Sequence, residues 1–217
     1  PPEVVFEEGN ALYAEQQYEA AIEKYEQITA QGYQTAAVYF NLANAHYKLG
    51  NVAPAILYYE RTLKLDPGDV DARYNLELAN RRVSDRIDPL PELMVVKWYK
   101  ALLAKKGSGG WMTLGIVFMW LALIAGIGWL VLSGGLKRAT AVLAVVLVAA
   151  ALLMVLLAAQ QRGYETSADH AIVYVTNTYV KSEPNAAAVD RFIIREGVKV
   201  ELLEKQGQWQ KISLANG

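Results

Sequence analysis

The sequence predicts a mainly α-helical membrane protein with three parts: a helical repeat array, a transmembrane helical hairpin and a small C-terminal β-barrel. Three observations predict this fold class. The first 103 residues repeat themselves with a period of 34 residues. Residues 111–159 hold two uncharged apolar runs, each long enough to cross a bilayer as a helix. Short β-branched runs separated by turn residues fill the stretch after residue 164.

The repeats occupy residues 1–88, as units at about 2–35 and 36–69 followed by a partial unit or cap at 70–88. Positions that match at this spacing include Tyr13 with Tyr47, Ala21-Ile22 with Ala55-Ile56, and Tyr25 with Tyr59. The pattern resembles the tetratricopeptide repeat, a helix-turn-helix unit of 34 residues. Each such unit buries its remaining face only against a neighbour. We therefore expect a helix at 70–85 to cap the array, or a partner to complete it.

The resemblance implies a concave groove, lined by the first helix of each unit, that binds protein. The residues at groove positions are Phe6, Asn10, Tyr13, Phe40, Asn44, Tyr47, Lys48 and Tyr74. The two asparagines would hold a peptide backbone, since an amide side chain both donates and accepts hydrogen bonds. Phe6, Tyr74 and Leu78 stand where relatives that grip a terminal carboxylate carry other side chains, so that clamp is not expected. The alternative role for the aromatic residues is packing between repeats.

Residues 89–110 are expected to form a linker and a helix lying in the membrane interface. Its lysines and its Trp-Tyr pair fit the headgroup region, although a plain helical stalk is the alternative. Transmembrane helices are expected at 111–132 and 139–159, with a turn at 133–138. Neither apolar run contains an ionisable residue, which argues against a transport pathway. The expected interface residues are Trp98, Tyr99, Lys105, Lys106, Trp111, Lys137 and Arg138.

A hairpin returns the chain to the side that it left, so both flanking regions should face one compartment. Residues 1–92 carry a net charge of −7, and residues 93–164 carry +7. Lys137 and Arg138 favour a cytoplasmic turn, whereas the lysines before the first run favour the opposite orientation. Charge alone therefore leaves the orientation open. The sequence begins with Pro1, for which a removed signal peptide is one expected explanation.

Several function classes find no support in the sequence. It contains no cysteine, so it offers no disulfide, thiol nucleophile or thiolate metal site. Its basic residues do not form a stripe away from the membrane flanks, which argues against nucleic acid as a partner. We find no nucleophile-base set, metal cluster or phosphate loop, so we expect a protein that is not an enzyme and uses no cofactor.

The C-terminal segment, residues 164–217, is expected to be a small barrel with its last strand missing. Its Val-Lys-Ser-x-Pro segment, Glu-Gly turn and Gly-x-Trp sequence resemble those of bacterial SH3-like domains, with Lys181 replacing an arginine. Such domains bind peptides or cell-wall fragments, or simply pack against other domains. The candidate contact residues are Tyr174, Tyr179 and Trp209, and packing on the barrel wall is the alternative role for Trp209.

The order of all these parts resembles the E component of the Bacteroides aerotolerance (Bat) operon proteins. The stretch "LDPGDVDARYNLELANRRVSDRIDPLPE" carries this resemblance most specifically. It implies a bacterial inner-membrane scaffold whose repeats and SH3-like domain lie on the periplasmic side. The implied partners are the lipid bilayer, membrane proteins with von Willebrand factor A domains and, across the membrane, a MoxR-type AAA ATPase. The alternative function is a cell-envelope sensor whose SH3-like domain binds peptidoglycan or peptides.

Overall fold

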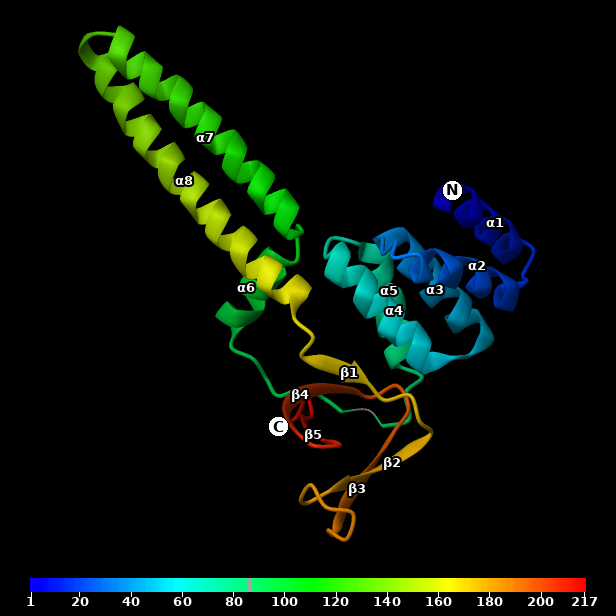
Figure 1. Ribbon diagram of the computed structural model, residues 1–217. Helices are drawn as coiled ribbons and strands as arrows, with labels where there is room; N and C mark the ends of the chain where they lie inside the picture. Colours follow the sequence, from blue (N-terminus) through cyan, green and yellow to red (C-terminus); the bar gives the residue numbers. More distant parts are fainter. Residues whose placement is uncertain (86) are drawn as a thin grey trace. The chain divides into compact units, whose positions relative to one another are not determined.

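A computed structural model describes residues 1–85 and 87–217 of the chain (Figure 1). The chain divides into two compact units. The first combines residues 1–93 with residues 168–217, and the second consists of residues 94–167. The first unit therefore contains the helical repeats and the C-terminal strands, and the second contains the long apolar helices.

The repeats consist of five helices that pack in sequence order. They are α1 (Pro2–Ala14), α2 (Tyr18–Ala30), α3 (Ala36–Leu49), α4 (Val52–Leu65) and α5 (Val70–Asn80). The Thr35 and Asp69 side chains cap α3 and α5 by accepting hydrogen bonds from backbone amides three residues on. Gly50 ends α3 with a φ of 81°, a conformation that glycine adopts without strain. The helix α5 ends at Asn80, five residues before the end that the sequence predicts.

Small residues and tyrosines form the core of the repeats. Ala21, Tyr25, Ala55 and Tyr59 are all fully buried. A Cβ atom on Gly9 would lie 2.6 Å from the Tyr25 ring, so α1 approaches α2 this closely only with glycine at that position. The 34-residue period thus reflects one packing arrangement used twice.

The C-terminal region is antiparallel, but it is not the closed barrel that the sequence predicts. The strands are β1 (His170–Ile172), β2 (Asn177–Lys181), β3 (Asp190–Arg195), β4 (Lys199–Gln206) and β5 (Trp209–Ser213). They form a sheet in the order β1-β4-β5 and a separate pair, β2-β3. Closure requires every strand to have a neighbour on both sides. Within the described part of the chain, β5 pairs only with β4, and β2 only with β3.

The second unit contains α6 (Met94–Leu103), α7 (Ser108–Val131) and α8 (Gly134–Thr166). The α7 and α8 helices lie antiparallel as a hairpin (Figure 1). Both are long and apolar enough to cross a membrane, and most of each apolar segment is exposed rather than buried within the chain. Only Leu132 and Ser133 separate them, so the turn is shorter than the expected 133–138. Lys137 and Arg138 lie in the first turns of α8, since residues 136–162 contain neither glycine nor proline.

Small residues form the contact between α7 and α8. Gly115, Ala122 and Ala151 are buried there, and a Cβ on Gly115 would lie 3.4 Å from the Ala151 carbonyl oxygen. The Ala122-x-x-x-Gly126 sequence predicts close contact at both of its small residues. Only Ala122 is buried, because a Cβ on Gly126 would meet no atom within 4 Å.

Hydrogen bonds join the start of α7 to the end of α8, at the end of the hairpin away from the turn. The Glu165 carboxylate accepts hydrogen bonds from the Ser108 amide at 2.7 Å and from the Ser108 hydroxyl at 2.5 Å. A negative charge is favourable at the N-terminus of a helix, which is where Ser108 places it on α7. Ser108, Gly109 and Gly110 form the first turn of α7, so the helix begins within the region 89–110 that the sequence assigns to the linker and interfacial helix.

Candidate functional site

The first helices of the three repeat units, α1, α3 and α5, present the predicted binding residues on one surface, which we call the repeat face. Phe6, Asn10 and Tyr13 lie on α1, and Phe40, Asn44, Tyr47 and Lys48 lie on α3. Tyr74 lies on α5. Contacts link α1 to α3 and α3 to α5, so the structure brings these residues onto neighbouring helices.

The two asparagines bridge successive units in the same way. The Asn10 Oδ1 atom accepts hydrogen bonds from the Tyr25 hydroxyl at 2.9 Å and from Asn41 Nδ2 at 2.8 Å. The Asn44 Oδ1 atom accepts from the Tyr59 hydroxyl at 2.6 Å and from Asn75 Nδ2 at 3.1 Å. Two donors occupy both lone pairs of an amide oxygen. Each asparagine can therefore offer a ligand only its Nδ2 donors, which suit carbonyl oxygens.

Sequence reasoning missed Asn41 and Asn75, the donors in these two bridges. A signal for them exists, because Asn41 and Asn75 are separated by one repeat period and each follows the aromatic residue at the matching position. The first unit has Glu7 at this offset, which hides the pattern.

Most of the predicted aromatic residues pack against the core and are also partly exposed on the repeat face. Phe6 lies 5.8 Å from the buried Tyr25 ring, and Phe40 lies 6.2 Å from the Tyr59 ring. Both phenylalanines are half-buried. Tyr13 packs edge-on against Tyr18 at 5.2 Å. One side of each of these rings therefore contacts the core, and the other side is part of the repeat face.

Tyr74, Lys48 and Arg82 give the repeat face its exposed polar and aromatic groups. Tyr74 is 60% exposed, and Lys48 is also exposed. The Arg82 guanidinium lies 3.9 Å from the centre of the Tyr47 ring, so it covers one face of that ring. This cation-π contact is a feature that sequence reasoning did not predict.

Burial raises the pKa of several tyrosines of this surface above the ordinary value of 10. It raises the pKa of Tyr25 to about 12, and it raises the pKa of Tyr59 as well. Burial also raises the pKa of Tyr13, with a smaller contribution from Tyr18. Tyr25 and Tyr59, the two tyrosines that donate to Asn10 and Asn44, are neutral at physiological pH.

The candidate contact residues of the β region lie in different surroundings. Tyr174 is half exposed, and burial raises its pKa to about 12, with Tyr58 of α4 as the next contribution. It therefore lies close to the repeats. Tyr179 is 59% exposed and pairs across the strands with Ile193, which is also exposed. Trp209 is half-buried at the start of β5.

The predicted interface residues of the membrane segment also separate into two groups. Trp98, Lys105, Lys106 and Arg138 are exposed, and the Lys137 ammonium lies 5.7 Å from the Trp129 ring. The Tyr99 hydroxyl donates to the Gln160 side chain of α8. Trp111 lies in different surroundings from these residues. It is only 6% exposed and donates its indole N–H to the Leu103 carbonyl oxygen at 3.2 Å, so it packs within its own unit.

Comparison with known proteins identifies the repeats. A tetratricopeptide repeat model matches residues 6–70. The chain carries tetratricopeptide repeats. It is 37% identical over 75 residues to sperm-associated antigen 1 of Rattus norvegicus and 36% identical over 75 residues to the same protein of Mus musculus. These matches cover 35% of this chain, which spans only 8% of the length of each relative.

Proposed function

We propose that the chain is a non-enzymatic, membrane-anchored scaffold that holds an extended segment of a partner protein on its repeat face. The observation that supports this most is the pair of bridged asparagines. Their Nδ2 donors lie one repeat apart, between half-buried aromatic walls, and suit the carbonyl oxygens of an extended peptide. Tetratricopeptide repeats suggest protein–protein interaction in general, and this arrangement supplies the chemistry.

The anchoring part of the proposal rests on α7 and α8. An apolar hollow of about 560 Å³ on the hairpin surface is lined by residues that include Met119, Leu123, Gly126, Ile127 and Val148. A bilayer-spanning helix of a partner would fit such a surface, because small residues allow backbones to approach closely. We propose that the hairpin docks against the membrane helices of the same partner.

The resemblance to the Bat operon proteins supports a more specific setting. We propose that the scaffold belongs to a bacterial inner-membrane assembly linked to stress tolerance, with repeats and β region on the periplasmic side. Its partners would be Bat proteins with von Willebrand factor A domains, with a MoxR-type AAA ATPase on the cytoplasmic side.

Site-specific photo-crosslinking in native membranes tests the scaffold. A photoreactive residue in place of Tyr74 lies on the repeat face, whereas one in place of Tyr33 is half exposed but follows α2, away from that face. We expect position 74 to crosslink to a membrane protein and position 33 not to do so. Recovery of the chain alone from both positions, at native expression levels, would rule out the proposal.

The exposed Tyr179–Ile193 pair supports a second candidate function, in which the β region reads peptidoglycan fragments or peptides. The full chain in detergent should then bind soluble wall fragments, and Tyr179→Ser should weaken this binding. Equal binding by both forms would exclude this surface as the reader.

A further inference from the structure

The last complete repeat packs against the C-terminal β region, although a long stretch of sequence separates them. Ile172 of β1 packs in the same apolar cluster as Ile56 and Tyr59 of α4. Both α4 residues are fully buried. The face where a further repeat would stack on an array of this kind is therefore occupied by a strand of the same chain.

A segment after α5 ties the repeats into the core of the β region. We call residues 83–85 and 87–90 the strap. Its Val83 and Ile87 side chains pack against Ile194, Val198 and Val200, the buried centre of the β region. The Leu90 amide donates to the Ala215 carbonyl oxygen at 3.1 Å. The β region thus has a core built from two distant parts of the sequence, the strap and residues 168–217.

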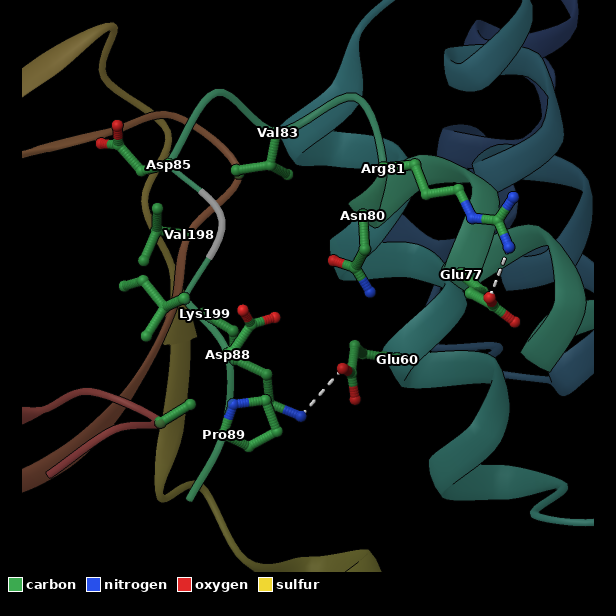
Figure 2. Close-up of a pocket in the computed structure, with 13 residues that line it drawn as sticks. Glu60, Glu77, Asn80, Arg81, Val83, Asp85, Asp88, Pro89, Val198 and Lys199 are labelled. Carbon is green, nitrogen blue, oxygen red and sulfur yellow. Dashed lines mark hydrogen bonds and ion pairs between the residues drawn. The ribbon is translucent and has the colours of Figure 1, made fainter. Parts of the chain in front are cut away.

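Ion pairs connect the β region to the repeats and to the strap. Lys199 of β4 pairs with Glu60 of α4 at 2.8 Å (Figure 2). The Asp85 carboxylate of the strap accepts a hydrogen bond from the Arg195 amide at 2.9 Å and pairs with the Arg195 guanidinium. A pocket of about 310 Å³ lies between these contacts. Since Glu60 and Glu77 of its lining already pair with Lys199 and Arg81, the pocket belongs to the junction rather than to a ligand site.

One glycine allows the closest approach of the two surfaces. Gly197, in the turn between β3 and β4, has a φ of +87°. A Cβ there would lie 2.8 Å from Val83 Cγ2 and 3.5 Å from Ile56 Cδ1. Any larger side chain would push the turn away from both the strap and α4.

We propose that the C-terminal β region is the cap of the repeat array and acts within the same chain. The exposed end of α4 and the strap that follows α5 have this region as their partner, so no second protein needs to complete the array there. A solenoid end without a cap would expose the apolar face on which its next unit stacks. A segment bound by the scaffold must then approach through the repeat face. This inference concerns the end of the array and does not depend on what the repeat face binds.

Hydrogen exchange of the full chain in detergent micelles tests the cap. The test variant is Gly197→Val, and the matched control is Gly207→Val, because Gly207 also has a positive φ (+61°) but no atom within 4 Å of a Cβ. We expect Gly197→Val to speed amide exchange in α5 and the strap on the order of tenfold. The control should leave exchange in α5 unchanged.

Charge reversal gives an independent variant that adds no bulk to the turn. Lys199→Glu and Glu60→Lys should each speed exchange in α5, and the double variant should restore protection because the pair is re-formed. Unchanged α5 protection in Gly197→Val and in both single charge variants would overturn the proposal, even if the β strands themselves became more mobile. Capture of a partner by the repeat face is measured separately, so failure of the scaffold proposal would not be mistaken for failure of the cap.

Discussion

At the residue scale, Asn10 and Asn44 combine structural and binding roles in one side chain. Each carbonyl oxygen joins a tyrosine of its own unit to an asparagine of the next unit. The amide nitrogens are the groups left for a ligand. A substitution at either position would therefore change stability and binding together, and the two effects must be measured separately.

Asn44→Ala is expected to destabilise the repeats by about 1–3 kcal/mol, because it leaves the buried Tyr59 hydroxyl and the Asn75 amide without their acceptor. Thermal unfolding of the full chain, followed by circular dichroism, measures this loss. In a Tyr59→Phe background the same substitution should cost less, since one of the two orphaned donors is already gone. Gln27→Ala, at an exposed amide of α2, is the control. An equal melting temperature for Asn44→Ala and the control would contradict the bridging role.

His46 makes the stability of the repeats depend on pH. Burial lowers its pKa below the ordinary value of 6.5, and its Nε2 is buried without a hydrogen-bond partner in the described part of the chain. Between the folded and unfolded pKa values, the unfolded chain binds a proton that the folded chain does not. Keeping His46 neutral therefore costs the folded repeats no stability above about pH 6.5, and their free energy of unfolding decreases as the pH falls below that value.

The expected result is a melting temperature that falls from pH 7 to pH 5 in the wild type and falls less in His46→Gln. Gln27→Ala, at an exposed uncharged residue of the same repeats, should keep the wild-type slope. Identical slopes in His46→Gln and the wild type would show that His46 is not the titrating group.

Single residues also show which features could be predicted from the sequence and which could not. The 34-residue period places Asn10 and Asn44 at equivalent positions, and both lie on the repeat face as expected. It did not reveal that their oxygens are already occupied, because that depends on donors from the next unit. The sequence also did not reveal the packing around Trp111. Tryptophan is common at membrane interfaces, but here α6 and α8 fold over the ring.

At the element scale, the helices and strands follow the sequence closely, and the errors lie where packing ends an element. Each strand overlaps one of the short β-branched runs, although the bounds differ by several residues; the strands lie at 170–172, 177–181, 190–195, 199–206 and 209–213. The barrel does not close, because closure is a property of strand pairing that alternation within a strand cannot specify. The helix α5 stops at Asn80 because the residues after it pack into the β region instead.

Two of the glycines of α7, Gly115 and Gly126, lead to opposite predictions about the hairpin. Gly115→Leu should force α7 from α8 and cost about 1–3 kcal/mol of overpacking. Gly126→Leu should be tolerated, because space around that position is open. Thermal stability of the full chain in detergent separates the two, with both variants adding the same side chain to the same helix. A larger loss for Gly126→Leu would mean that this open face, rather than the α7–α8 contact, carries the packing.

At the scale of the whole molecule, the sequence identified each part but not how the first and last are joined. The strap and the β region are separated by the entire membrane segment, so no local pattern links Val83 or Asp85 to residues near 195. Contact over such a distance arises only when the chain folds. The consequence is that residues 94–167, which contain the two long apolar helices, are an insertion between two pieces of one folded unit.

The hairpin predicts that the repeats and the β region share one side of the membrane, with the α7–α8 turn on the other. The cysteine-free chain allows single cysteines to report this directly. We expect Gln34→Cys and Ser182→Cys, both at exposed positions, to react with an impermeant maleimide added to cells with a permeabilised outer membrane. Ser133→Cys should react only after the inner membrane is opened, because Lys137 and Arg138 near the turn favour the cytoplasm. If Gln34→Cys is labelled and Ser182→Cys is not, the repeats and the β region lie on opposite sides and the hairpin interpretation is wrong. If only Ser133→Cys is labelled in cells with an intact inner membrane, the orientation is the reverse of the one proposed.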